Sequence, residues 1–190
     1  MKNKKMKDSL FMLINFLKNP KETGAITMSS KYLTKGIIKN IDFKNSKNII
    51  ELGPGLGTFT KVILKKASPD AKVICFEVNN KFCNYIKKNC ADDRLIVINA
   101  GADSIRKELK KIQIKKADCI ISGLPFKNFP EIKRKKILAE VKNALNENGR
   151  FIIFQYTNSL SAMLDLYFDK VKKSFVPLNI PPSFIYRCEN

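Results

Sequence analysis

Histidine is absent from this chain, and its absence removes several kinds of active site at once. A histidine metal site and a Ser-His or Cys-His nucleophile pair are both excluded. Proton transfer must then use carboxylates, phenols, lysines or backbone carbonyls. Cysteines are few, five in 190 residues, and none are spaced as Cys-x-x-Cys. We therefore expect neither a disulfide framework nor a metal site, and a reducing, cytoplasmic setting fits.

Long hydrophobic runs are also missing, because no apolar stretch approaches the ~20 residues that span a bilayer. Acidic residues are scarce, at 17 against 36 basic ones, which gives a formal net charge of +19. Such a charge favours an anionic partner, either nucleic acid or an acidic membrane surface. A hydrophobic fraction of 44% in 190 residues predicts one globular domain with a sizeable core.

The first 18 residues predict an amphipathic helix with a wide apolar face and a basic rim. This composition is typical of a helix that lies on a membrane surface. It predicts a peripheral position on the inner face of the cell membrane. Two alternatives are a helix that packs on the domain and a signal peptide, although Asp8 and Asn15 interrupt the apolar stretch. The residues expected to contact the membrane are Lys5, Lys7, Phe11, Phe16 and Lys18.

From residue 41 onward, apolar β-branched runs alternate with helical patterns. The expected strands are 48–52, 72–78, 95–99, 118–122 and 150–156, and the expected helices are 58–66, 80–89, 104–111, 131–146 and 159–169. Gly149 is expected to stop the fourth helix. Short runs at 173–178 and 183–188 predict an antiparallel strand pair at the end. This alternation predicts a doubly wound α/β sheet for residues 41–190, with 1–40 as a separate leading segment.

A glycine-rich turn, Gly53-Pro54-Gly55-Leu56-Gly57, follows the first strand, and Thr58 is expected to cap the next helix. The spacing Gly-x-Gly-x-Gly differs from the Gly-x-Gly-x-x-Gly of dinucleotide folds. It also lacks the Gly-Lys-Ser/Thr of a Walker loop. Glu51 at the strand end would repel a pyrophosphate, but it suits a ligand that carries an ammonium group.

Two further acids follow the next two strands. Glu77 comes 20 residues after Gly57, where a carboxylate can accept hydrogen bonds from both ribose hydroxyls. Asp103 follows the third strand and could accept from an adenine amino group. Ordinary turn glycines and surface acids are the alternative. Three acids at the ends of three successive strands favour a nucleoside ligand with a positive charge.

Glu-x-Gly-x-Gly-x-Gly followed by Glu77 and Asp103 resembles the class I S-adenosylmethionine-dependent methyltransferases. The resemblance implies a Rossmann-like sheet, S-adenosyl-L-methionine as cofactor and S-adenosylhomocysteine as product. Ser29 and Ser30 would close a lid over the cofactor. The cofactor-binding residues it implies are Glu51, Gly53, Gly55, Gly57, Thr58, Glu77, Val78, Ala102, Asp103, Ser122 and Ser30.

Two families share the string Glu-Leu-Gly-Pro-Gly-x-Gly-x-Phe/Leu-Thr, namely the rRNA adenine dimethyltransferases and the small bacterial phospholipid N-methyltransferases. Adenine methylases carry Asn/Asp-x-Pro-Tyr/Phe after the fourth strand. This chain instead has Ser-Gly-Leu-Pro at 122–125 and then Asn-Phe-Pro at 128–130, which resembles the phospholipid family. Segments 19–30 and 179–182 are similar to that family too, although Met28 replaces its usual proline.

The resemblance therefore implies methylation of phosphatidylethanolamine and its methylated forms, by a monomer at an anionic membrane surface. Tyr156 and the carbonyls of Gly123 and Leu124 are expected to accept the amine hydrogens. Phe126 could form one wall for the methylated ammonium, beside Asn128. Alternatively, the Tyr156 ring merely packs there and Phe126 belongs to the core.

The basic run at 133–136 opens a helix, where the macrodipole disfavours cations. It indicates a phosphate partner, and a solvated basic face is the alternative. Two other functions stay open for the whole chain. One is methylation of rRNA adenine or of another nucleic acid, with the positive charge following the phosphates. The other is a non-catalytic protein that binds the cofactor or a membrane surface.

Overall fold

A computed structural model describes residues 24–190, with side chains from Lys31 onward. The predicted amphipathic helix and its membrane contacts, at Lys5, Lys7, Phe11, Phe16 and Lys18, lie outside the described residues. The side chains of Ser29 and Ser30 lie outside them too, so the predicted lid stays a prediction. Within the part that is described, no helix combines the length and the apolar character needed to cross a bilayer.

The helices and strands alternate along the chain as the sequence predicts. The strands are β1 (Asn48–Leu52), β2 (Lys72–Phe76), β3 (Leu95–Ile98), β4 (Ala117–Ser122), β5 (Leu145–Gln155), β6 (Lys170–Val176) and β7 (Ser183–Glu189). The α-helices are α2 (Gly24–Ile38), α3 (Thr58–Lys66), α4 (Asn80–Asn89), α5 (Ile105–Lys111), α6 (Glu131–Ala144) and α7 (Ser161–Asp165). Short 3-10 turns, η1 (Ala102–Ser104) and η2 (Phe126–Asn128), follow β3 and β4.

The strands form one seven-stranded sheet in the order β3-β2-β1-β4-β5-β7-β6. Strands β1 to β5 are parallel, whereas β7 runs antiparallel to both β5 and β6. The order reverses at β1, which lies between β2 and β4. Ligands of such sheets bind outside the carboxyl ends of the strands at this point, so the topology places the site after β1.

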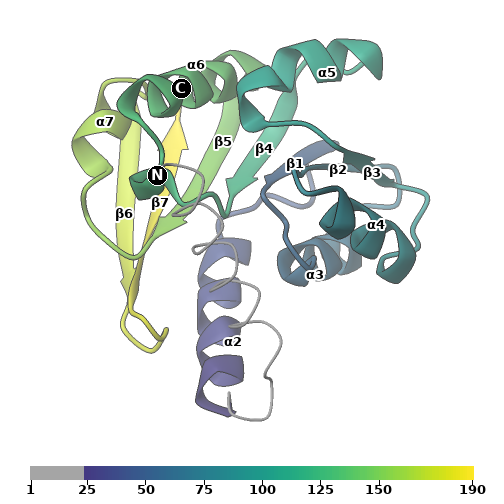
Figure 1. Cartoon of the computed structure of the whole chain (residues 1–190). Coiled ribbons are helices and arrows are strands. Elements are labelled where there is room, and N and C mark those ends of the chain that lie inside the picture. The colour runs from purple at the N-terminus through teal and green to yellow at the C-terminus, as the bar shows by residue number, and fades with distance from the viewer. Residues whose placement is uncertain (1–23) are drawn as a thin grey trace.

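Helices cover both faces of the sheet, and each face has its own apolar core (Figure 1). Helices α5, α6 and α7 pack on one face, mainly through leucine, isoleucine and valine side chains. Helices α2, α3 and α4 pack on the other. The β-branched strand residues are buried on both faces, as expected for a central parallel sheet.

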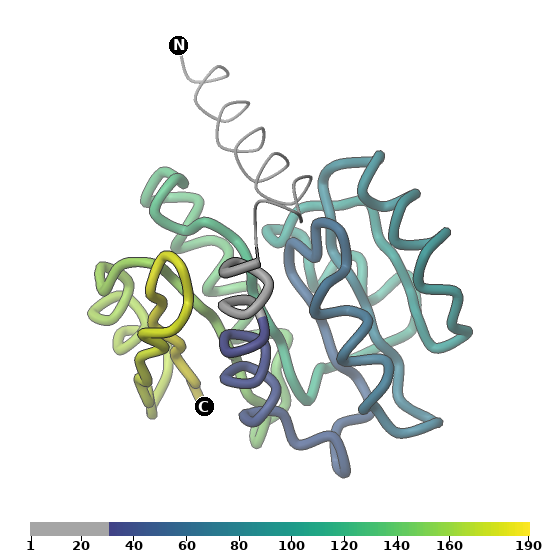
Figure 2. Tube along the Cα trace, turned by 90° about the horizontal axis from the view of Figure 1, so that it is seen from below, coloured from purple at the N-terminus to yellow at the C-terminus, as the bar shows by residue number. Residues whose placement is uncertain are grey.

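Helix α2 is absent from the sequence-based prediction. Its residues include glycine, serine, threonine and isoleucine, which have modest helix propensity. It forms a buried face with Leu33 and Ile37, and a Cβ at Gly36 would lie 2.7 Å from Ile185 Cδ1. Figure 2 shows α2 between α3 and the C-terminal strands. Tertiary packing therefore accounts for this helix better than its local sequence does.

Other boundaries differ from the prediction in ways that packing explains. Helix α6 ends at Ala144, and Gly149 lies inside β5 instead of stopping the helix. A Cβ at Gly149 would be 2.9 Å from the Asn146 carbonyl oxygen, so close backbone contact requires glycine there. Helix α7 is much shorter than the predicted 159–169. Strand β6 begins at Lys170, because exposed lysines are acceptable on a sheet edge.

Candidate functional site

The glycine-rich turn leaves β1 at the carboxyl edge of the sheet. Gly53, Gly55 and Gly57 have φ values of 71°, 56° and 75°, in the left-handed region that favours glycine. Hydrogen bonds fix the turn: the Gly53 amide donates to Phe76 O, and the Gly57 amide to Pro54 O, both at 2.9 Å. Gly57 is the N-cap of α3 in place of the predicted Thr58, which is exposed as the first helical residue.

Glu51 is a buried acid directly below this turn. The Thr60 hydroxyl donates to its Oε2 at 2.6 Å, and the Cys75 thiol lies 3.7 Å from the same atom. Its other oxygen, Oε1, is buried without a hydrogen-bond partner. Burial raises the pKa of the Glu51 carboxyl from 4.5 to about 7. An unpartnered buried carboxylate oxygen is costly, so its presence points to a ligand that supplies a positive donor.

Glu77 follows β2 and reaches back to the same turn. One carboxylate oxygen accepts from the Gly55 amide at 3.2 Å, and the other from the Asn79 amide at 2.9 Å. Burial raises the pKa of this carboxyl. A carboxylate has about four acceptor positions, so these two amides leave capacity for the two hydroxyls of a ribose. The predicted ribose partner thus lies beside the glycine turn.

The third acid lies after β3, next to an exposed apolar side chain. Asp103 belongs to η1, and its Oδ2 is 3.5 Å from Lys136 Nζ. A Cβ at Gly101 would clash with Asp103 Oδ1 and lie 3.8 Å from Val78 Cγ1. Val78 is 72% exposed, whereas the neighbouring Ala102 is buried. An exposed apolar group beside a carboxylate suits the flat face and the amino group of an adenine.

These features fit S-adenosylmethionine along the carboxyl ends of β1, β2 and β3. Glu51 would hold the ammonium end, Glu77 the ribose, and Val78 with Asp103 the adenine. A Cβ at Gly55 would meet nothing within 4 Å, so open space faces the turn. When bound, this cofactor supplies an electrophilic methyl group on a sulfonium, and the protein must place an acceptor atom opposite the sulfur.

The turn after β4 forms the neighbouring part of the site, and internal hydrogen bonds engage two of the groups predicted there. Ser122 is completely buried, and its hydroxyl accepts from the Leu124 amide at 3.2 Å, so it shapes the turn. The Leu124 carbonyl already accepts from the Phe126 amide and from Gln155 Nε2, both at 2.9 Å. Both of its lone pairs are therefore used, and Gly123 remains the carbonyl candidate.

Gln155 is a residue that the sequence-based prediction missed. Its Nε2 donates both to Leu124 O and, at 2.6 Å, to Phe154 O. The side chain is buried at the end of β5 and therefore ties that strand to the Gly123–Leu124 turn. A glutamine next to Tyr156 was a weak signal, because glutamine is usually a surface residue.

Phe126 is fully buried, at 0% exposure, and packs against Phe129 with 6.0 Å between ring centroids. It is a core aromatic, so the predicted ammonium wall at this residue is wrong. The aromatic side chain beside Gly123 is instead Phe154, whose Cε1 lies 3.6 Å from the position of a Gly123 Cβ. Phe154 contacts Phe59 and Tyr156, with ring centroids 5.8 Å and 6.1 Å away. Side chains in a strand alternate between the two faces of the sheet, and this alternation in β5 was the sequence signal that could have identified Phe154.

Tyr156 directly follows β5 and is 48% exposed at the same edge. Partial burial raises the pKa of its phenol above the usual 10, which keeps the hydroxyl neutral near pH 7. A neutral phenol oxygen can accept a hydrogen bond from an amine, but it is a poor proton-abstracting base. Asn128 ends η2 and is exposed.

The basic run at the start of α6 is partly neutralised by neighbouring acids. Lys135 pairs with Glu131 at 2.8 Å, and Lys136 pairs with Asp103. Lys133 Nζ lies 4.9 Å from the centroid of the Phe129 ring. These contacts offset the unfavourable helix dipole, so the run by itself no longer indicates a phosphate partner.

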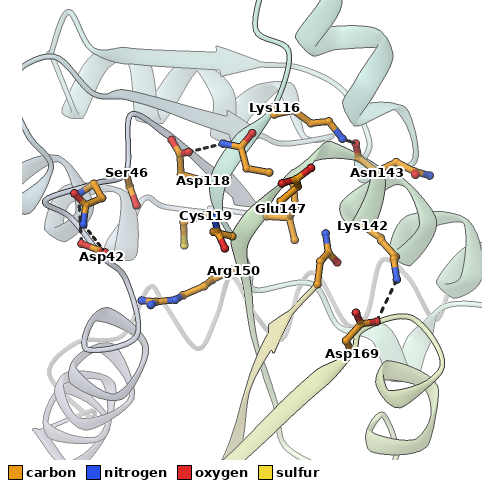
Figure 3. Close-up of a pocket in the computed structure, with 15 residues that line it drawn as sticks. Asp42, Ser46, Lys116, Asp118, Cys119, Lys142, Asn143, Glu147, Arg150 and Asp169 are labelled. Carbon is orange, nitrogen blue, oxygen red and sulfur yellow. Dashed lines mark hydrogen bonds and ion pairs between the residues drawn. The ribbon is translucent and has the colours of Figure 1, made fainter.

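A cavity of about 1130 Å³ lies at the opposite edge of the sheet, at the amino ends of the parallel strands (Figure 3). Asp118, at its wall, accepts from the Lys47 and Asn48 amides at 2.8 Å. Lys142 faces Asp169 across 4.0 Å. Asp118 and Lys142 are thus engaged by the protein's own groups, and we place the chemistry at the carboxyl edge.

Comparison with known families gives one match over most of the chain. Residues 15–174 match the family described as ribosomal RNA adenine dimethylase. The ornithine lipid N-methyltransferase of Singulisphaera acidiphila is 30% identical over 96% of this chain and 96% of its own. The ribosomal RNA small subunit methyltransferase A of Mycoplasmopsis pulmonis is 30% identical over 47% of this chain. The alignment covers only 32% of that enzyme.

Among solved structures, the N-methyltransferase NodS from Bradyrhizobium japonicum has the same fold, with a TM-score of 0.68 at 8% identity. The superposition covers 85% of this chain and 96% of NodS. Its complex with S-adenosyl-L-homocysteine is similar as well, with a TM-score of 0.65. At this identity the likeness establishes the methyltransferase fold alone.

Proposed function

The chain belongs to the ribosomal RNA adenine dimethylase family and is an S-adenosylmethionine-dependent methyltransferase, and from this premise we propose that it methylates the amine of a membrane lipid headgroup. The main support is the alignment with the ornithine lipid enzyme, which extends over 96% of both chains. Matches to rRNA enzymes such as that of Mycoplasmopsis pulmonis stop at about half of this chain. The full-length likeness includes the segments that we expect to face the acceptor.

The side chains near Gly123 are suited to an amine acceptor. An amine must lose its proton before it attacks a methyl group, and burial or nearby positive charge lowers an amine's pKa. The net charge of +19 acts in that direction. The Tyr156 oxygen and the Gly123 carbonyl would orient the remaining hydrogens. The rings of Phe59 and Phe154 attract the ammonium that methyl transfer creates.

Two headgroups fit this proposal. The relative's name indicates ornithine lipid, and the sequence resemblance indicates phosphatidylethanolamine. Both present a primary amine close to negatively charged oxygens, and neither requires an aromatic platform on the β4 turn. The buried Phe126 provides no such platform, which disfavours a stacked adenine base.

A direct test supplies methyl-labelled S-adenosylmethionine to the purified full chain. Vesicles containing phosphatidylethanolamine, vesicles containing ornithine lipid, and transcribed small-subunit rRNA are tested as separate acceptors. We expect label in one or both lipids and none in the RNA. Label in the RNA alone would refute the proposal.

Methylation of rRNA adenine is the second candidate, and the family match over residues 15–174 favours it. A strongly basic surface also suits an RNA backbone. The observation against this candidate lies after β4. Ser122 and Phe126 are both buried there, so neither offers a polar or aromatic side chain to an adenine base. The same three-acceptor experiment separates the two candidates.

A further inference from the structure

The turn between β6 and β7, residues 177–182, presents apolar side chains to solvent. Leu178 and Ile180 are 59% and 54% exposed, and Phe175, at the end of β6, is 53% exposed. The three prolines of this turn are exposed as well. No charged residue occurs between Lys173 and Arg187, although 28% of the chain is charged. An exposed apolar segment in so charged a protein indicates an interaction surface.

A buried asparagine holds this turn in shape. Asn179 is 4% exposed, and its Nδ2 donates to Pro181 O at 2.7 Å and to Ser183 Oγ at 2.8 Å. Its backbone amide donates to Val176 O at 3.3 Å. With Asn179 directed inward, the residues on either side of it, Leu178 and Ile180, are directed outward. The apolar tip is therefore a fixed feature of the fold.

The turn lies on the same side of the molecule as the site, at the carboxyl ends of the parallel strands. Strand β7 is antiparallel to β5, and Phe184 pairs with Gln155, so β7 begins where β5 ends. Asn158, two residues beyond Tyr156, is bonded to the two strands that carry the turn. It accepts from the Tyr186 hydroxyl at 2.9 Å and from Lys173 Nζ at 3.2 Å. A surface that contacts this turn is thus next to Tyr156.

We propose that the 177–182 turn inserts into the headgroup region of an anionic bilayer and orients the site toward the membrane. The proposal rests on the proposed lipid-amine function. Basic residues adjoin the apolar tip: Lys173 Nζ lies 5.7 Å from the Phe184 ring centroid, and Lys172 is exposed beside it. Aliphatic side chains with flanking lysines match an anionic bilayer. RNA is disfavoured, because phosphates are bound by cations and donors and not by leucine and isoleucine.

The test uses the full chain and vesicles of phosphatidylethanolamine with phosphatidylglycerol, sedimented in the presence of S-adenosylhomocysteine. The variant is Leu178→Ser with Ile180→Ser. The control is Leu166→Ser, because Leu166 is 80% exposed but precedes the start of β6, at the opposite edge. Removing two inserted aliphatic side chains should weaken vesicle binding about tenfold or more. The control should bind as the parent does, and all three should bind S-adenosylhomocysteine equally.

Equal vesicle binding by the double variant and the parent would overturn the proposal. So would a loss of RNA binding in the double variant with vesicle binding unchanged, or a parent dimer that this variant converts to a monomer. Failure of the proposed function is a separate result: the parent would bind vesicles through the turn yet transfer no methyl group to lipid. Conversely, the parent could methylate lipid while the double variant binds vesicles as well as the parent does. That result would refute the role of the 177–182 turn and leave the proposed function standing.

Discussion

At the scale of single residues, we expect Glu51 to link folding to cofactor binding. Its carboxyl is buried beneath the glycine turn, one oxygen is bonded to Thr60, and the other has no partner. Such a group costs folding free energy while the site is empty. An ammonium group beside it would pair with the ionised carboxylate, and this pairing would strengthen binding of the ligand.

The first prediction concerns stability and pH. An unfolded Glu51 ionises near 4.5, whereas the folded one holds its proton to about 7. Between these values the unfolded state has lost a proton that the native state keeps, so rising pH favours unfolding. The contribution is up to about 3 kcal/mol across that window and constant above it. In denaturant unfolding, Glu51→Gln should lack this decline, so the difference in unfolding free energy from the parent grows with pH. Parallel curves would contradict the prediction.

A second prediction follows for ligand affinity. S-adenosylhomocysteine should bind the parent more tightly as pH rises from about 6 to about 8, with proton release, since the ionised carboxylate is the form that pairs with ammonium. Glu51→Gln should bind at least about tenfold more weakly at the upper pH and show little pH dependence. Calorimetry in buffers of different ionisation enthalpy measures both effects. Glu147→Gln, exposed at the opposite edge, is the control and should behave as the parent.

At the scale of structural elements, the glycine turn offers a matched pair of substitutions. Gly55→Ala places its Cβ in open space, so it should cost only about 1–2 kcal/mol of backbone strain. It should nevertheless weaken S-adenosylhomocysteine binding, because the alanine Cβ would occupy the space in which we place the ligand. Gly53→Ala brings its Cβ to 2.8 Å from Leu124 Cδ2 and should lower stability more. Thermal unfolding and calorimetry compare the two, and unchanged affinity in Gly55→Ala would refute the placement of the cofactor.

The link between β5 and the β4 turn gives another prediction. Gln155→Leu keeps the side-chain volume but removes the hydrogen bonds to Leu124 O and Phe154 O. Without these bonds the Gly123–Leu124 turn loses its fixed position beside β5, so we expect kcat for lipid methylation to fall about tenfold. Affinity for S-adenosylhomocysteine should stay at the parent value, since Gln155 positions the acceptor side. Steady-state kinetics with calorimetry test this, and an equal loss in both would indicate a general structural defect.

Much of the geometry around the glycine turn was predictable from sequence because its signals are local. Glycines with positive φ and acids at strand ends follow from single short segments, and Glu51 and Glu77 lie where those segments predict. The acceptor half depends on contacts distant in sequence. Phe126 and Phe154 are the same residue type, and only the tertiary structure separates them: Phe126 lies in one apolar core, and Phe154 lies beside Gly123. Helix α2 was missed for the same reason, since β5 to β7 stabilise it.

At the scale of the whole molecule, this chain aligns with two kinds of methyltransferase whose names give different acceptors, a lipid and an rRNA. The chain spans about a third of the rRNA enzyme of Mycoplasmopsis pulmonis, whereas it spans 96% of the ornithine lipid enzyme. A net charge of +19 suits either acceptor, because both are polyanions at the scale of the protein surface. Under the proposed function, the choice of acceptor would depend on the β4 turn, Tyr156 and the 177–182 turn.

The most direct measurement is a competition in a single reaction. The full chain receives methyl-labelled S-adenosylmethionine together with small-subunit rRNA and vesicles that contain phosphatidylethanolamine and ornithine lipid. The products are then separated into lipid and RNA. We predict that the label enters the amine of a lipid headgroup and that added RNA does not take it up. Label in adenine of the RNA, with unlabelled lipid, would contradict the account.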